Sequence, residues 1–414
     1  MGSLNRRSFF GAGAGIAGAF AMENLSAAVQ DNSTPYQRPK LKITDVKSAN
    51  LQGFHVRIYT DQGLYGDGEG VDAVSGGPSI LQGFRSSLIG QSPLNIQAIW
   101  ERIRTSGIFG GAQAGQYVAT LTAVELALWD LAGKALNLPI YQLMGGKVRD
   151  KIRVYCDSGT DSRDDPQAKP YIQQIIDNGF TMAKIDIDDA ADPARFDRVN
   201  WTANNTEIDH MVDRVAFMRE SLPKSIELAV DMHGRYDLPT AKRVARELEP
   251  FKLVWLEEPV PPENIDAMRD VRQSTHTPIC AGENIYMRWG FREIFEKQAL
   301  DIIMPDIQKC GGLMEGKKIA DMAQAYYVPI APHSQASPVG AMATAHMLST
   351  VPNFLVLEYH WTHPPQRWER WKHFVKGEDI IQKGYITVPD KPGIGVETNE
   401  DYLKKLPGTT WFPA

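Results

Sequence analysis

This 414-residue chain has few cysteines, no stripe of basic residues and no long hydrophobic run. Three cysteines, Cys156, Cys280 and Cys310, are too few for a disulfide scaffold at this length, so we expect buried free thiols. The net charge of −6 argues against a nucleic-acid partner. The glycine-rich stretch at residues 107–115 lacks the GK[ST] ending of a phosphate-binding loop, so it is either a mobile flap over the barrel mouth or a plain flexible loop. A hydrophobic content of 43% is enough for a large core.

The N-terminus has the pattern of an export signal. Arg6 and Arg7 precede a small, apolar run that offers an A-x-A cleavage site at residues 19–21. The run is too short for a stable membrane span. We therefore expect residues 1–21 to be a twin-arginine signal and residues 22–39 to be a linker. The mature protein would then be periplasmic or secreted and free of the membrane; a cytoplasmic location is the alternative.

Three carboxylates stand at equal intervals along the chain. Asp231, Glu257 and Glu283 are separated by 26 residues each, and each follows a short apolar run. A strand, a helix and their loops occupy about that length in a (β/α) barrel, so the acids would converge at the carboxyl ends of neighbouring strands. Like charges this close suppress one another's ionisation, and a hard divalent cation relieves that cost. We expect one Mg²⁺ per subunit here; three unrelated surface acids are the alternative.

Eight apolar runs alternate with helical stretches after residue 150, which predicts an α/β fold with a (β/α)8 TIM barrel. Before them, residues 40–150 combine strand-like segments with helices, which indicates a separate α+β lobe. The eight runs, in chain order, are IRVYC, TMAKIDI, IELAVDM, KLVWLE, PICAG, ALDIIMP, VPIA and FLVLE.

Other strand ends carry further reactive side chains. His233 lies two residues after Asp231, so on an extended backbone both side chains would point the same way. Asp306 ends ALDIIMPD, and His333 follows it at a barrel-repeat interval of 27 residues. Glu358 ends FLVLE, 25 residues further on. A single histidine at the end of an apolar strand is usually a structural residue with its hydrogen bonds made. Only the acids expected beside His233 and His333 favour a catalytic role.

These motifs together resemble a known family. The runs VDMHGRY, WLEEPVPPEN, AGENIY, MPDIQKCGG and APHS are similar to the mandelate racemase branch of the enolase superfamily, in particular to acid-sugar dehydratases of the galactonate and gluconate type. The resemblance implies that the α+β lobe caps a modified barrel at residues 151–375. It also implies that residues 376–414 return to the capping domain, and that the protein is a homo-oligomer.

The resemblance also implies roles for individual residues. His333, paired with Asp306, would be the base that removes the proton at C2 of the substrate. His233 would be the acid that protonates the departing hydroxyl, and Glu358 would contact the substrate carboxylate. We assign the base to His333 because it is the only histidine with an expected carboxylate partner.

Lys184 marks a departure from part of that family. Racemases and muconate-lactonising relatives carry Lys-x-Lys on the second strand, whereas this chain has Lys184-Ile185-Asp186. Without the second lysine, transfer of a proton between two faces of one carbon is disfavoured. Lys184 is expected either to bind the substrate carboxylate or to pair with an acid of the metal site.

The predicted function is therefore a Mg²⁺-dependent hydro-lyase that acts on an aldonic acid. It would remove the C2 proton, form an enediolate stabilised by the metal, and eliminate the 3-hydroxyl to give a 2-keto-3-deoxy sugar acid. An epimerase or cycloisomerase of the same superfamily is the first alternative. An exported sugar-acid binding protein is the alternative from another class, and it would need no histidine–aspartate pair.

Overall fold

The computed structural model describes residues 39–158, 162–195, 197, 199–360 and 370–413. The chain divides into two units, Met1–Lys40 and Leu41–Ala414, and every element below belongs to the second. The predicted export signal and all but the last residue of the predicted linker lie outside the described residues. Within the described ranges, no helix has both the length and the apolar character needed to cross a membrane.

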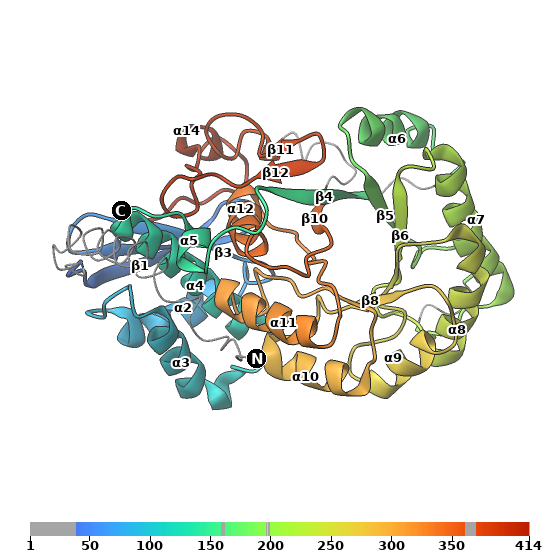
Figure 1. The fold of residues 1–414 in the computed structure, drawn as a ribbon, viewed down its shortest axis with the longest axis horizontal. Helices are drawn as coiled ribbons and strands as arrows, with labels where there is room; N and C mark the ends of the chain where they lie inside the picture. The colour runs from blue at the N-terminus through green and yellow to red at the C-terminus, as the bar shows by residue number, and fades with distance from the viewer. Residues whose placement is uncertain (1–38, 159–161, 196, 198, 361–369, 414) are drawn as a thin grey trace, which may run out of the picture. The chain divides into compact units, whose positions relative to one another are not determined.

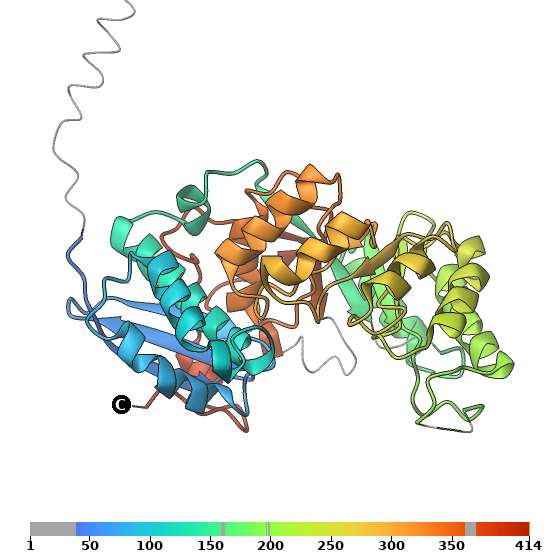
Figure 2. The same cartoon turned by 90° about the horizontal axis from the view of Figure 1, so that it is seen from below.

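The first lobe is a three-stranded antiparallel sheet with helices packed on one face (Figure 2). The strands run in the order β1-β2-β3, and the long helix α4 lies against them. The elements are β1 Ile43–Asn50, β2 Phe54–Thr60, β3 Tyr65–Gly70, α2 Gly77–Leu88, α3 Ile96–Ser106, the 3-10 turn η1 Ile108–Gly110, α4 Gly115–Leu136 and α5 Ile140–Leu143.

Alternate glycines on β3 allow the backbone of α4 to lie directly on the strand. A Cβ atom on Gly66 would lie 2.1 Å from the carbonyl oxygen of Ala127, and one on Gly68 would lie 2.1 Å from that of Ala123. Residues two apart share a strand face, and residues four apart share a helix face, so the two periods match. The sequence YGDGEG therefore specifies a helix–strand contact without intervening side chains.

The second lobe is a closed ring of eight parallel strand positions (Figure 1). Neighbours pair from β4 through β9, isolated parallel bridges then join Ile303 to Ile330 and Ile330 to Phe354, and β10 pairs with β4. This arrangement confirms the predicted α/β barrel class. Its strands are β4 Lys151–Ser158, β5 Met182–Asp186, β6 Glu227–Asp231, β7 Leu256–Glu257, β8 Ile279–Ala281, β9 Ile302–Ile303 and β10 Leu357–His360.

Helices connect successive strands on the outside of the ring (Figure 1). After β10 the described chain adds the hairpin β11–β12, which extends the sheet beside β4. Near the C-terminus, Asn50 of β1 exchanges backbone hydrogen bonds with Thr410. The remaining elements are α6 Ala168–Asp177, α7 Asn205–Ser221, α8 Leu238–Glu247, η2 Glu249–Phe251, α9 Ile265–Arg272, α10 Met287–Lys297, α11 Leu313–Ala325, α12 Pro338–Leu348, β11 Ile381–Gln382, β12 Tyr385–Thr387 and α14 Glu400–Leu403.

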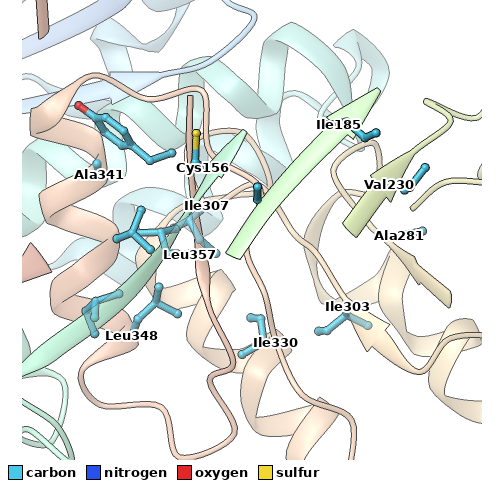
Figure 3. Close-up of a cluster of buried hydrophobic side chains, with 14 of the residues drawn as sticks. Cys156, Ile185, Val230, Ala281, Ile303, Ile307, Ile330, Ala341, Leu348 and Leu357 are labelled. Carbon is cyan, nitrogen blue, oxygen red and sulfur yellow. The ribbon is translucent and has the colours of Figure 1, made fainter. Parts of the chain in front are cut away.

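Barrel side chains alternate between two buried apolar groups. One group, which includes Cys156, Ile185 and Val230 (Figure 3), packs together with the surrounding helices. The other joins side chains such as Tyr155 and Trp255 in a separate cluster. All three cysteines are buried and free, as predicted; Cys156 belongs to the first group and Cys280 to the second, while Cys310 joins the first from beyond β9.

The charged side chains of the site each lie two residues beyond a member of the second apolar group. Lys184 follows Met182 by two residues, Asp231 follows Ala229, and Glu257 follows Trp255, so each polar side chain shares a strand face with a core residue. Closely packed apolar side chains thus form the floor under the charges. The same rule places Asp306, His333 and Glu358 two residues beyond Met304, Ala331 and Val356.

Two glycine-to-alanine changes test the close approach of α4 to β3. Gly68→Ala would place a methyl group 2.1 Å from backbone, and we expect a loss of about 2–3 kcal/mol in the free energy of unfolding. Gly83→Ala on α2 is the matched control, because its methyl group meets no atom within 4 Å. The control should be neutral or stabilising by up to about 1 kcal/mol. Denaturant unfolding of both variants measures the difference, and equal stabilities would contradict this packing.

Candidate active site

The buried ammonium of Lys184 on β5 is surrounded by carboxylates. The Lys184 side chain is 3% exposed, and Nζ lies 3.0 Å from Asp231 Oδ2, 3.1 Å from both carboxylate oxygens of Glu257 and 3.4 Å from Glu358 Oε1. Burial lowers the pKa of Lys184, but the charges of Glu257 and Glu358 outweigh it and hold that pKa well above its usual range. One positive charge therefore faces three carboxylates.

Glu257 is fully buried and is hydrogen-bonded to a tryptophan of the barrel core. Trp255, two residues earlier on the same strand face, donates its indole N–H to Glu257 Oε2 at 3.0 Å. Burial and the charge of Asp231 raise the pKa of Glu257 well above its usual range, although Lys184 opposes them. A further cation would favour the ionised form of this carboxyl group.

The third acid of the predicted triad reaches the site through a turn. Gly282 has φ 144°, and a Cβ there would lie 3.0 Å from the backbone of Met304, so glycine is required at this position. Glu283 follows, and its Oε2 lies 2.8 Å from His333 Nε2. In this structure Asp231 and Glu257 therefore meet at Lys184, whereas Glu283 meets His333.

Two groups of side chains bring possible metal-ligand atoms within 4.8 Å of one another in the described chain. The first contains Asp186, Asp231 and His233. The second contains His333, Glu358 and His360. Asp231 is the one member of the predicted triad in these groups, and carboxylate oxygens are the donors that Mg²⁺ prefers.

His333 and Asp306 form the predicted pair. His333 Nδ1 lies 2.7 Å from Asp306 Oδ2, and both side chains are buried. Asp306 is itself fixed, because its Oδ1 accepts a hydrogen bond from the backbone N–H of Gln308 at 2.8 Å. Burial lowers the pKa of His333, but the charges of Glu283 and Glu358 outweigh it and hold that pKa well above its usual range. The Nε2 atom of His333 is left to face the other carboxylates.

The expectation of an extended backbone at His233 is wrong. His233 has φ 47°, in the left-handed region, and its backbone N–H donates to Asp231 Oδ1 at 2.7 Å. This tight turn still brings the ring toward the site, with His233 Nε2 3.7 Å from Asp231 Oδ2. Histidine tolerates the left-handed region better than most residues, and such strain is concentrated at functional sites.

The expectation that only His333 has a carboxylate partner is also wrong. His233 Nδ1 lies 3.0 Å from Oδ1 of Asp188, whose side chain is 5% exposed. Burial lowers the pKa of His233, but the hydrogen bond to Asp188 and the charge of Asp231 raise it to about 10. His233 and Asp188 thus form a second histidine–aspartate pair beside that of His333 and Asp306.

Sequence reasoning assigned no role in the site to Asp157 or Asp186. His360 on β10 lies 3.3 Å from Asp157 Oδ2 through Nδ1 and 3.3 Å from Glu358 Oε1 through Nε2. Burial, together with the charge of Asp157, raises the pKa of Asp186 to about 8. Period-two alternation from Tyr155 and Lys184 could have found both aspartates, because each lies two residues further along its strand.

Residues 107–115, the predicted flap, border a cavity of about 980 Å³. Ala112 and Gln113 line it from the capping domain, and Asn284 and Tyr286 line it from the barrel. Asn284 also donates a hydrogen bond to Glu283 Oε1 at 3.0 Å, so the cavity adjoins the charged site. Movement of this loop stays a prediction.

Both lobes of the chain match known protein families. Residues 168–402 match the family described as Enolase C-terminal domain-like, and residues 25–145 match the Mandelate racemase / muconate lactonizing enzyme, N-terminal domain. A D-xylonate dehydratase of Haloferax volcanii is 39% identical over 402 residues, which cover 95% of this chain and 96% of that protein. A D-galactonate dehydratase of Pectobacterium atrosepticum is 33% identical over 371 residues, which cover 88% and 94%.

A solved structure is similar to this chain in both fold and sequence. A mandelate racemase/muconate lactonizing enzyme-like protein from Rubrobacter xylanophilus superimposes with a TM-score of 0.85 at 39% identity, and the match covers 91% of this chain and 100% of that chain. Both domains of the chain thus match the same family. The chain belongs to the mandelate racemase/muconate lactonizing enzyme family of the enolase superfamily.

Proposed function

We propose that this protein is a Mg²⁺-dependent dehydratase of aldonic acids that yields 2-keto-3-deoxy sugar acids. The observation that carries the proposal is that His333 and His233, each paired with an aspartate, lie beside one ring of buried acids. One histidine can accept a proton and the other can donate one. The dehydratase activities of the two relatives support five- and six-carbon aldonates as the first substrates to test.

The donor set fits a divalent cation. Asp231, Glu257 and Glu358 share the ammonium of Lys184, and no other lysine or arginine of the described residues pairs with them. We propose that Asp231, Glu257 and Glu283 hold the ion, with Asp186 beside them. A bound Mg²⁺ would supply charge stabilisation for a substrate carboxylate that gains negative charge.

Proton transfer falls to the two histidines. His333 Nε2 would accept the C2 proton, while Asp306 holds the opposite ring nitrogen and stabilises the imidazolium. Removal of the C2 proton leaves its electron pair in the enediolate form of the substrate carboxylate. That pair then forms the C2=C3 double bond as the C3–O bond breaks. His233 would give its proton to the departing hydroxyl, which leaves as water, and the enol product becomes the 2-keto-3-deoxy acid.

Lys184 argues against racemisation at this site. Its ammonium is engaged by three carboxylates, and the residue two positions further is Asp186 where the racemases carry a second lysine. No lysine of β5 is therefore left to act as a base on the opposite face of C2. Epimerase and cycloisomerase activities remain the alternatives, and they need no acid for a leaving hydroxyl.

Glu257 provides a test of the metal. Glu257→Gln removes a charge at the buried site, and we expect Mg²⁺ binding measured by titration calorimetry to weaken by more than about 10-fold. Glu258→Gln is the matched control, since Glu258 is also buried but accepts a hydrogen bond from Asn284. Excess EDTA should abolish activity and added Mg²⁺ should restore it; full activity in EDTA would contradict the metal assignment.

Replacing each histidine by asparagine separates the two roles. His333→Asn should lose both exchange of the C2 proton with solvent deuterium and dehydration, because both reactions need the base. His233→Asn should lose dehydration by roughly 10²–10⁴-fold but retain C2 exchange, because proton removal precedes the need for the acid. Proton NMR in D₂O follows both reactions, and His276→Asn, at an exposed position, is the control.

If His233→Asn lost both reactions and His333→Asn retained C2 exchange, His233 would be the base and His333 the acid. Unchanged turnover in His233→Asn would instead favour an epimerase or cycloisomerase, because such a reaction expels no hydroxyl.

A further inference from the structure

Asp188 lies just beyond the end of β5 and is buried beside His233. Its side chain is 5% exposed, and the preceding residue, Ile187, donates its backbone N–H to the carbonyl of Asp231 at 3.0 Å. That bond ties the chain leading to Asp188 to the end of β6, where His233 begins its turn. The two residues are therefore fixed relative to each other by backbone as well as by side chains.

Each oxygen of Asp188 lies close to a nitrogen of a basic side chain. Oδ1 lies 3.0 Å from His233 Nδ1, and Oδ2 lies 3.0 Å from Nε of Arg235, whose side chain is 45% exposed. Arg235 is two residues after His233, so the same turn supplies both partners. The ion pair with Arg235 lies on the exposed side of the carboxylate, and the hydrogen-bond contact with His233 lies on the side of the site.

This contact determines which ring nitrogen carries the mobile proton. An ionised carboxylate can only accept a hydrogen bond, so the contact requires hydrogen on His233 Nδ1. Nε2 is therefore the ring nitrogen left to face the site, and it lies 3.7 Å from Asp231 Oδ2.

We propose that Asp188 is the positioning residue for His233 as general acid, holding the ring so that Nε2 delivers the proton to the leaving group at C3. The inference rests on the proposed dehydratase function. It gives the site two parallel pairs, with Asp306 behind the base and Asp188 behind the acid. Neither aspartate touches substrate; each acts through its histidine.

A substrate whose leaving group needs no proton isolates this role. In a 3-deoxy-3-fluoro aldonate, the base removes the C2 proton, the C2=C3 bond forms and the C3–F bond breaks. Fluoride departs with the bonding pair and requires no acid. A defect confined to the acid therefore slows loss of water but spares loss of fluoride, whereas general damage to the site slows both.

The experiment uses the full-length protein with Mg²⁺, the aldonate that the wild type dehydrates best, and the 3-fluoro analogue of that aldonate. Asp188→Asn should lower the dehydration rate by roughly 10²–10⁴-fold, because an amide can stabilise the wrong imidazole tautomer. It should release fluoride within about threefold of the wild-type rate, and a fluoride electrode measures this. Asp189→Asn is the matched control, because Asp189 follows directly but pairs with Arg214.

Each outcome decides the inference. Dehydration at the wild-type rate in Asp188→Asn, or equal losses of dehydration and fluoride release, would overturn it. If that variant is unfolded at the assay temperature, Arg235→Gln decides instead, with a loss of dehydration of at least threefold expected and fluoride release unchanged. Equal effects or no effect in that variant would overturn the inference. A wild type that dehydrates no aldonate would contradict the proposed function itself, independently of these variants.

Discussion

The concentration of buried negative charge around Lys184 is the constraint on which this site depends. Asp231, Glu257 and Glu358 all approach one ammonium within 3.4 Å, in an environment from which water is largely excluded. Carboxylates buried together are costly unless cations and hydrogen bonds compensate them. Lys184 compensates part of this negative charge, and a bound divalent cation would compensate the rest.

The capping domain contributes to this site by fixing the loop that follows Asp306. The backbone N–H of Val71 donates to the carbonyl of Gln308 at 3.1 Å, and the buried Lys309 lies 3.0 Å from Asp72. The Gln308 backbone N–H in turn holds the Asp306 carboxylate. A chain of contacts thus connects the first sheet to the carboxylate that orients His333.

The barrel and most of the charged side chains at its rim were predictable because side chains alternate between the two faces of a strand. Side chains two apart on a strand share a face, so a carboxylate after an apolar run, as at Asp231 or Glu257, points where the inner core residues point. The regular 26-residue spacing then places such residues on neighbouring strands. Asp306 with His333 followed from the same reasoning, and the structure brings them to 2.7 Å.

What escaped prediction depends on local turns and on contacts across strands. The left-handed backbone at His233 redirects its ring toward Asp188, and no apolar pattern encodes that turn. Gly282 similarly shifts Glu283 out of the alternation and brings it to His333. These positions depend on backbone conformations that become visible only when neighbouring strands are placed side by side.

The central claim is that the wild-type site removes the C2 proton and expels the C3 hydroxyl of one substrate. Analysis of the product formed from an aldonate carrying deuterium at C2 tests it most directly, by mass spectrometry and NMR in ordinary water. The account predicts a 2-keto-3-deoxy acid that has lost the C2 deuterium and gained a solvent hydrogen at C3. Recovery of a C2 epimer with the 3-hydroxyl intact, or a keto acid that retains the label, would contradict it.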